Sequence, residues 1–270
     1  MNYFVPLHPL NRKNMKKLII LLALLMGFSA IQDIEAARRK RRKARTVHVQ
    51  KPVKLSLHDQ NPYLTCEDTC AHIHGIDVSH YQHEVFWETI GDNTNMAYVY
   101  LKATEGVDRV DERFERNIDM AHRHGLKVGS YHFYRPKLET RRQMENFKNR
   151  VLPGEQDLIP MLDVETLGDL PVPQFCDSLS KMLTLFEETY HQKPLVYTYR
   201  NFYNKYLQGR IDGYPLMIAT YADEQPVLDD GRDYLIWQYT CKGRLNGVSG
   251  EVDKSRFVGD HSLREIRFQR

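Results

Sequence analysis

The sequence predicts an α/β fold, an irregular barrel in which about five βα units are followed by further strands. From residue 73 onward, short β-rich runs alternate with amphipathic helical segments, which is the pattern of parallel strands joined by helices. The last strands lie only about 20 residues apart in sequence, which leaves little room for full crossover helices. An open doubly wound sheet is disfavoured because the first strand ends in Asp77 and not in a glycine-rich phosphate-binding turn.

The expected strands are apolar runs rich in β-branched and aromatic residues. Their centres lie near Ile76, Val99, Val128, Met161, Val196, Ile218 and Ile236, and an eighth strand is expected at 252–257. Apolar residues at three- and four-residue spacing predict helices over 111–124, 139–151 and 174–191. A short helical piece is expected at 202–207, before the closely spaced final strands.

Four acidic residues are expected at the mouth of this barrel, because functional groups of β/α barrels lie at the carboxyl ends of the strands. Asp163 and Glu165 end the fourth strand and share one face of it, since strand side chains alternate. Asp77 ends the first strand, and Asp253 lies on the last strand, which neighbours the first in a closed barrel.

Crowded carboxylates can hold one member protonated at neutral pH, as a general acid requires. A single acid at a strand end is most often a helix cap or a solvated side chain. Two acids on one face of an apolar strand are costly to bury without a function, so Asp163 and Glu165 are candidate catalytic residues. Four carboxylates would also suit a divalent cation, an alternative that the sequence leaves open.

Aromatic side chains gather at the same strand ends: Tyr131, Phe133, Tyr197, Tyr199, Trp237 and Tyr239. Aromatic residues are common in ordinary strand cores, but beside carboxylates they also form stacking surfaces for sugar rings. Lys102, His132 and Gln238 are candidate polar partners for such a ligand. Carboxylates with aromatics indicate glycoside hydrolysis.

The charge distribution argues against a nucleic-acid-binding protein. Residues 1–45 contain 11 of the 38 basic residues and two acids, which leaves 27 basic and 33 acidic residues in 46–270, a net charge of −6. That part of the chain lacks the basic surface that nucleic acid binding requires.

Residues 1–36 have the pattern of a signal peptide, with basic residues before a 14-residue apolar run at 18–31. The run is shorter than a membrane-spanning helix, and we expect export to the periplasm, the cell envelope or the medium. Seven positive charges at 38–45 oppose translocation, so an uncleaved inner-membrane anchor is the alternative. Residues 37–70 are expected to be a basic, disordered linker, acting as a spacer or as an electrostatic tether to a membrane or a wall polymer.

The four cysteines allow disulfides in an exported chain. Cys66 and Cys70 could close a small loop, whereas Cys176 and Cys241 would need long-range pairing. Their spacing does not favour a zinc site, and inert thiols are the alternative to disulfides.

Eight ordered segments resemble one family, the glycoside hydrolase family 25 lysozymes, the Chalaropsis-type N-acetylmuramidases. They are GIDVSHYQ (75–82), YLKATEG (100–106), FERNIDMAHRHGLKVGSYHF (114–133), PMLDVE (160–165), KPLVYTY (193–199), YPLMIATY (214–221), WQYT (237–240) and GEVDKSRF (250–257). The resemblance implies a single catalytic domain over 71–258, an irregular TIM-like (β/α)5(β)3 barrel, with a C-terminal tail at 259–270. It also implies hydrolysis of the β-1,4 bond between N-acetylmuramic acid and N-acetylglucosamine in bacterial peptidoglycan.

By motif position, the resemblance implies Glu165 as general acid and Asp163 as the group that assists the substrate's acetamido group. Asp77 and Asp253 match the two further acids of the family site. The expected substrate-binding residues are Lys102, Glu105, Tyr131, Phe133, Tyr197, Tyr199, Trp237 and Gln238. No cofactor or metal is expected, the partner is the peptidoglycan glycan strand, and a monomer is expected.

Four alternatives stay open: a different mechanism, a different glycan, binding without cleavage, and a metal-dependent reaction. Substrate-assisted attack by the N-acetyl oxygen is preferred over direct attack of water with inversion. The substrate could be another N-acetylated glycan such as chitin, or the barrel could bind glycan without cleaving it. A metal-dependent hydrolase would lose activity in chelator.

The sequence departs from the family around the groove. Arg109 and Glu112 follow the TEG segment where the family has an aromatic residue and a proline, and Met217 and Thr220 replace a tryptophan and an arginine. These changes put subsite contacts in doubt and predict an altered substrate preference.

Overall fold

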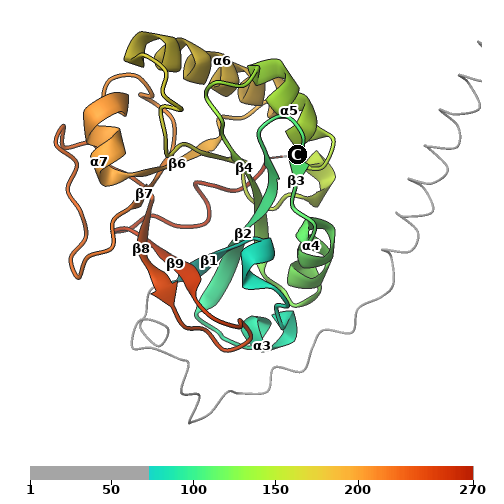
Figure 1. Ribbon diagram of the computed structural model, residues 1–270. Helices are drawn as coiled ribbons and strands as arrows, with labels where there is room; N and C mark the ends of the chain where they lie inside the picture. The colour runs from blue at the N-terminus through green and yellow to red at the C-terminus, as the bar shows by residue number, and fades with distance from the viewer. Residues whose placement is uncertain (1–72, 270) are drawn as a thin grey trace, which may run out of the picture. The chain divides into compact units, whose positions relative to one another are not determined.

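The computed structural model describes residues 73–269, and these form a closed barrel of eight strands (Figure 1). The N-terminal expectations, including the signal peptide at 1–36, the linker at 37–70 and the Cys66–Cys70 loop, lie outside the described residues. The closed mixed α/β barrel confirms the predicted fold class.

Eight strands form the barrel wall, and the segments between them contain the helices. The barrel strands are β1 (His74–Val78), β2 (Met96–Glu105), β4 (Lys127–Phe133), β5 (Met161–Asp163), β6 (Leu195–Tyr199), β7 (Leu216–Ala219), β8 (Ile236–Gly243) and β9 (Val252–Phe257). The helices are α3 (Trp87–Gly91), α4 (Phe114–Arg123), α5 (Thr140–Lys148), α6 (Val172–Tyr190) and α7 (Arg200–Phe202), with the π-helical turn η3 (Tyr203–Leu207). The 3₁₀ turns are η1 (His80–Gln82) and η2 (Pro153–Glu155), and β3 (Arg109–Val110) is a two-residue strand.

The strand order explains why the acidic residues meet. The strands from β1 through β2, β4, β5, β6, β7 and β8 pair in parallel, so their carboxyl ends share one mouth of the barrel. β9 closes the barrel by pairing antiparallel with both β8 and β1. The sequence analysis expected this arrangement of five βα units followed by three strands.

The barrel interior beneath the mouth is filled by two tyrosine rings that lie against glycines. A side chain at Gly75 would meet the ring of Tyr98 at 2.0 Å, and one at Gly129 would meet the ring of Tyr100 at 2.3 Å. The Tyr98 hydroxyl is 3.0 Å from the Ser255 hydroxyl. These glycines therefore allow large rings to close the lower barrel.

Helices cover the outside of the strands because each has one apolar face (Figure 1). α6 buries Phe175, Leu179, Met182, Leu183, Phe186 and Tyr190, at three- and four-residue spacing. α4 buries Phe114, Ile118 and Ala121 together with Asn117, whose side-chain oxygen accepts a 3.1 Å hydrogen bond from the Trp87 indole of α3. The expected helices at 111–124, 139–151 and 174–191 correspond to α4, α5 and α6.

The segment after β9 is packed against the barrel. Ile266 is fully buried, its carbonyl oxygen accepts a 2.8 Å hydrogen bond from the Ile159 amide, and the Phe268 amide donates to Asp157. Residues 259–269, separated in the sequence analysis as a tail, therefore contribute to the hydrophobic core.

Two further findings concern the described residues. None of their helices is long and apolar enough to cross a membrane. Cys176 and Cys241 are both half-buried free thiols.

Candidate active site

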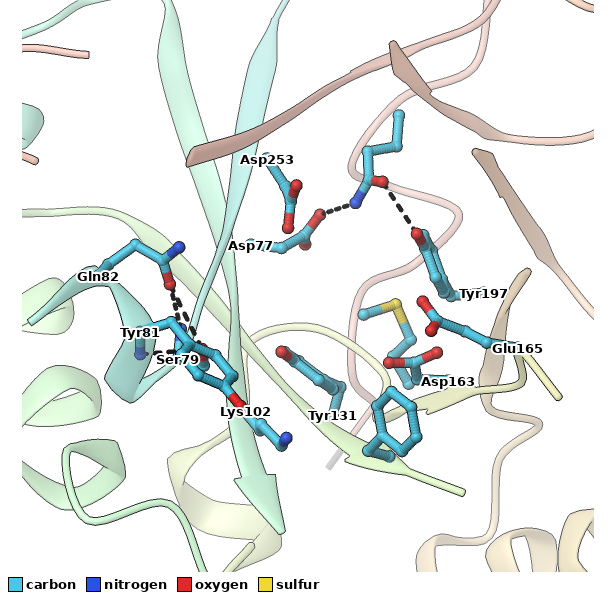
Figure 2. A pocket seen from close by; sticks show the side chains of 13 residues that line it. Asp77, Ser79, Tyr81, Gln82, Lys102, Tyr131, Asp163, Glu165, Tyr197 and Asp253 are labelled. Carbon is cyan, nitrogen blue, oxygen red and sulfur yellow. Dashed lines mark hydrogen bonds between the residues drawn. The ribbon is translucent and has the colours of Figure 1, made fainter. Parts of the chain in front are cut away.

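A pocket of about 180 Å³ lies at the carboxyl ends of the strands (Figure 2). Its lining includes Asp77 from β1, Asp163 and Glu165 at the end of β5, and Asp253 from β9. The four acids that the sequence predicts at the barrel mouth therefore meet in one pocket. The remaining lining residues are Ser79, Tyr81, Gln82, Lys102, Tyr131, Phe133, Met161, Tyr197 and Gln238.

Asp77 and Asp253 form one pair of acids. They are direct partners in the antiparallel register of β1 and β9. Burial, followed by the charge of Asp253, raises the pKa of Asp77 to about 8. Burial, followed by the charge of Glu165, raises the pKa of Asp253 to about 7. This pair therefore carries a proton at neutral pH.

Asp163 and Glu165 form the second pair, with the fully buried Val164 between them. Burial, followed by the charge of Glu165, raises the pKa of Asp163 well above its ordinary value. Burial also raises the pKa of Glu165, against the opposing effects of a hydrogen bond with Tyr199 and the charge of Lys102. The two side chains lie side by side in Figure 2. A raised pKa is what a general acid at neutral pH requires.

Two carboxylate oxygens in the pocket lack protein partners within residues 73–269. These are Oδ1 of Asp77 and Oδ1 of Asp163, and both are buried. Buried polar atoms are normally hydrogen-bonded, so these two oxygens are suited to accept hydrogen bonds from a ligand.

A hydrogen-bonded chain connects the first acid pair to the aromatic side of the pocket. Gln238 donates to Asp77 at 2.8 Å and accepts from the Tyr197 hydroxyl at 2.9 Å (Figure 2). The Tyr221 hydroxyl donates to the same Gln238 oxygen at 3.1 Å. This chain fixes the amide orientation of Gln238 beside the acids.

Of the predicted substrate-binding residues, Lys102, Tyr131, Phe133, Tyr197 and Gln238 line the pocket. Glu105, Tyr199 and Trp237 do not. The Tyr199 side chain forms a hydrogen bond with Glu165. Glu105 forms an ion pair with Lys102 at 2.8 Å.

Trp237 is a core side chain, only 2% exposed, and its indole donates to the Thr220 carbonyl oxygen at 2.8 Å. Its strand neighbour Gln238 points to the pocket, and adjacent strand residues face opposite sides. Met217 and Thr220, two of the positions where the sequence departs from the family, lie in the same region. Met217 is fully buried, and the Thr220 carbonyl oxygen accepts the hydrogen bond from Trp237. His132 is likewise buried, hydrogen-bonded with Thr104 and Gln143, and burial lowers its pKa to about 4.

Three lining residues that the sequence analysis did not select, Ser79, Tyr81 and Gln82, come from η1 and its N-cap position. Ser79 caps this turn, with its amide donating to the Gln82 side chain at 2.9 Å. The turn presents Tyr81, which is 70% exposed, at the edge of the pocket (Figure 2). The sequence signal that could have identified them is Ser79, a polar residue that directly follows the first strand and can cap a turn at the barrel mouth.

Residues 73–269 contain no group of three or more His, Cys, Asp or Glu side chains arranged to hold a metal ion. The four acids instead form the two pairs described above.

The fold and the site together define a β/α-barrel protein of the glycosidase type, with paired carboxylates and aromatic side chains at the barrel mouth. The chain belongs to the glycosyl hydrolases family 25, whose family model matches residues 76–248. This confirms the resemblance found in the sequence.

Three individual proteins illustrate the similarity. The uncharacterized protein YegX of Escherichia coli K12 is 33% identical over 191 residues, covering 69% of this chain and 70% of that protein. Lysozyme M1 of Streptomyces globisporus is 28% identical over 201 residues, covering 69% of this chain and 68% of that protein. The crystal structure of a lysozyme from Streptomyces coelicolor superposes with a TM-score of 0.64 at 27% identity, covering 72% of this chain and 95% of that one.

Proposed function

We propose that this protein is a peptidoglycan muramidase, which hydrolyses the β-1,4 bond between N-acetylmuramic acid and N-acetylglucosamine. The observation that carries the proposal is the pair of Asp163 and Glu165 at the pocket, with the pKa of both carboxyls raised. Family membership and the similarity to proteins named lysozymes support peptidoglycan as the substrate.

In this proposal Glu165 is the general acid. It donates its proton to the glycosidic oxygen as the bond to the anomeric carbon breaks. Burial raises its pKa, which favours the protonated form that a general acid needs.

Asp163 assists the substrate's own acetamido group. The acetamido oxygen attacks the anomeric carbon, and Asp163 accepts a hydrogen bond from the acetamido N–H, which holds the group in place. The Asp163 Oδ1 atom, without a partner within the described residues, is suited to that contact. The Glu165 carboxylate then takes a proton from water, and the water oxygen attacks the anomeric carbon. This step opens the cyclic intermediate, restores the acetamido group and returns the proton to Glu165. Direct attack of water with inversion is the rival mechanism.

The other pocket residues position the glycan. Tyr131, Phe133 and Tyr197 supply aromatic surface, and the exposed Tyr81 adds a ring at the edge of the pocket. The raised pKa values of Asp77 and Asp253 favour a protonated carboxyl near neutral pH, which would be a hydrogen-bond donor for a sugar hydroxyl or carbonyl group.

A peptidoglycan substrate agrees with the export expected from residues 1–36, because peptidoglycan lies outside the cytoplasmic membrane. We therefore propose that the protein acts in the periplasm, in the envelope or in the medium. Protease treatment of intact cells and spheroplasts would locate it.

The test of the catalytic assignment compares two matched variants. Release of soluble fragments from dye-labelled peptidoglycan should fall at least about 1000-fold in Glu165→Gln, because an amide cannot donate the proton. Glu188→Gln makes the same change on the exposed face of α6 and should keep wild-type activity. Full activity in Glu165→Gln would overturn the assignment. Cleavage of chitin in preference to peptidoglycan, or tight binding without cleavage by the wild type, would support the alternative functions.

A further inference from the structure

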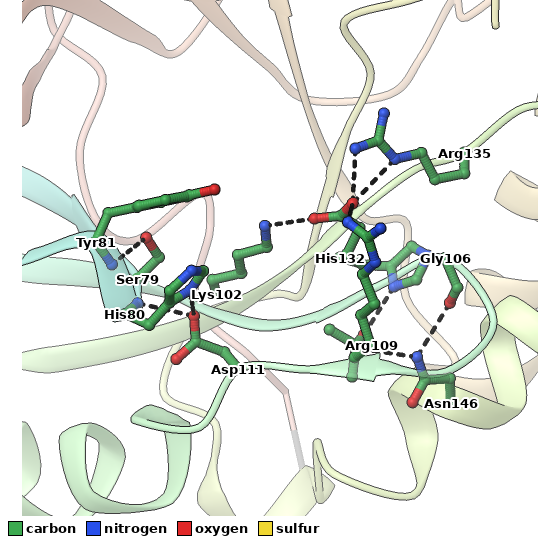
Figure 3. A network of polar contacts seen from close by, with 12 residues as sticks. Ser79, His80, Tyr81, Lys102, Gly106, Arg109, Asp111, His132, Arg135 and Asn146 are labelled. Atoms are coloured by element: carbon green, nitrogen blue, oxygen red, sulfur yellow. Dashed lines mark hydrogen bonds and ion pairs between the residues drawn. The ribbon is translucent and has the colours of Figure 1, made fainter.

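One carboxylate beside the pocket holds three cationic side chains (Figure 3). Glu105 Oε2 accepts from Lys102 at 2.8 Å, and Glu105 Oε1 accepts from Arg109 at 2.9 Å and from Arg135 at 2.6 Å. We name these four residues, Lys102, Glu105, Arg109 and Arg135, the Glu105 cluster. It contains one negative and three positive charges.

The positive charge of the Glu105 cluster persists across the physiological pH range. Burial opposes ionisation of Glu105, but hydrogen bonds from Lys102 and Arg135 lower its pKa to about 2. The carboxylate therefore stays ionised and the cluster keeps a net charge of +2. The arginines face solvent, because the side chain of Arg109 is 73% exposed and that of Arg135 is 42% exposed.

Arg109 retains free hydrogen-bonding capacity. Only its Nη1 group donates to Glu105, and no acceptor within residues 73–269 contacts Nε or Nη2. Those two groups form the edge of a guanidinium that binds a carboxylate through two parallel hydrogen bonds. Arg109 can therefore bind a second carboxylate without releasing Glu105.

The backbone that presents Arg109 is anchored. Arg109 pairs with Glu105 across the short hairpin of β2 and β3, and Asn146 of α5 donates to the carbonyl oxygens of Gly106 and Arg109, both at 3.0 Å (Figure 3). Gly106 has a positive φ of 56°, which suits the tight turn. The position of the arginine is thus set before a ligand binds.

The Glu105 cluster adjoins the pocket through Phe133, which lines the pocket. The Lys102 ammonium lies 5.1 Å from the centre of the Phe133 ring, and the Arg135 guanidinium lies 4.5 Å from it. The pocket itself contains four acids. The acidic pocket and the basic Glu105 cluster therefore lie next to each other. A ligand with a neutral main chain and an anionic branch would fit them, with the main chain in the pocket and the branch on the cluster.

We propose that the Glu105 cluster, through Arg109 and Arg135, binds carboxylates of the peptide that branches from muramic acid in peptidoglycan. The proposal rests on the proposed muramidase function. The neutral sugar chain occupies the acidic pocket while the peptide carboxylates lie on the basic cluster. The protein then prefers glycan strands that carry charged peptides.

The test measures binding to two preparations of purified peptidoglycan that differ only in peptide charge. One is native, and in the other the carboxylates are coupled to methylamine with a carbodiimide, which makes them neutral amides. Both are first treated with hydrofluoric acid, which removes phosphate-containing polymers. Sedimentation binding uses full-length Glu165→Gln, so that the substrate is not digested, and variants are made in that background.

Arg109→Gln is compared with Arg123→Gln, which removes the same charge from another exposed i,i+4 ion pair, that of Arg123 with Asp119 on α4. The basic residues at 38–45 add the same charge to every variant, so the decisive quantity is the ratio of native to amidated affinity. We expect Arg109→Gln to lower this ratio by about threefold to tenfold. Arg123→Gln should leave the ratio unchanged, and Arg109→Lys should restore part of it.

Equal ratios in Arg109→Gln and Arg123→Gln would overturn the proposal, as would equal weakening on both preparations. Failure of the muramidase function is a separate result. It would appear as no cleavage of either preparation by the wild type, whereas the binding ratio would still report on the Glu105 cluster.

Discussion

Asp77 and Asp253 stand directly opposite each other where β1 pairs with β9, the contact that closes the barrel. Antiparallel register places two acids at one point of the pocket wall, although 176 positions separate them in the sequence. Burial and the charge of Asp253 raise the pKa of Asp77 to about 8, and burial with the charge of Glu165 raises that of Asp253 to about 7. The pairing of β1 with β9 that closes the barrel therefore also brings together the two acids whose pKa values are raised.

The first prediction is that Asp77 makes the free energy of unfolding fall as pH rises. Its pKa is higher in the folded state than in the unfolded chain, so the unfolded state loses its proton first as pH rises. The stabilising effect of the bound proton is complete below about pH 4 and is lost as pH rises to about 8. Between pH 5 and pH 8, Asp77→Asn should therefore lose less stability than the wild type, by on the order of 2 kcal/mol.

Thermal unfolding at a series of pH values measures this effect. The Tm of Asp77→Asn should rise relative to the wild type as pH increases. Asp169→Asn, which changes a carboxylate that is 92% exposed, is the control and should parallel the wild type. Parallel curves for Asp77→Asn would contradict the assignment of a raised pKa to Asp77.

The second prediction concerns the hydrogen bond between Tyr199 and Glu165. This bond stabilises the Glu165 carboxylate and lowers its pKa. Without it, in Tyr199→Phe, Glu165 should keep its proton to higher pH. Since a general acid acts only when protonated, the alkaline limb of kcat should shift upward by about 0.5 to 1 pH unit.

The control for this experiment is Tyr214→Phe, which removes a hydroxyl that hydrogen-bonds with Glu187 away from the pocket. Its pH profile of kcat should match that of the wild type. An unchanged or downward-shifted alkaline limb in Tyr199→Phe would show that Glu165 does not determine that limb.

The third prediction is the stereochemistry of the product. Attack by the acetamido group followed by water inverts the anomeric carbon twice, so the first product should have the β configuration. Proton NMR of a soluble glycan oligomer during the first minutes of reaction distinguishes the anomers. An initial α product would contradict the role proposed for Asp163 and favour direct attack of water.

The fourth prediction tests whether the last residues belong to the barrel. Ile266 is fully buried, so Ile266→Ala should reduce the free energy of unfolding by about 2 to 5 kcal/mol. Leu263→Ala, at a partly buried position, should cost less. Urea unfolding measures both, and a loss below about 1 kcal/mol for Ile266→Ala would contradict a structural role for 259–269.

Local patterns in the sequence predicted most of the fold. The strands were predictable as short continuous apolar runs, because the barrel buries both faces of strands such as β1, β2 and β7. The helices α4, α5 and α6 were predictable because each buries one face, which leaves a period of three to four in the sequence. The helix α3 and the strand β3 were not predicted, because five and two residues are too few to establish a period. The packing of Ile266 depends on contacts with the distant residue Ile159, which no local pattern records.

The site was predictable where strand alternation determines the facing side. Asp163 and Glu165, two residues apart, both line the pocket, as do Tyr131 and Phe133. Trp237 and Gln238 are adjacent, so only one of them could face the pocket. Glu105 and Arg135, which form an ion pair, are 30 residues apart in the sequence. No local pattern predicts this pair, because only the folded structure brings the two residues together.

The most direct test of the central claim is the identity of the sugar at the new reducing end. Purified peptidoglycan is digested with the wild-type protein and with Glu165→Gln, each with and without EDTA, then reduced with borohydride and analysed by mass spectrometry. We predict fragments that end in reduced N-acetylmuramic acid, absent with Glu165→Gln and unaffected by EDTA. Fragments that end in reduced N-acetylglucosamine, or identical products from Glu165→Gln, would contradict a muramidase with Glu165 as its acid.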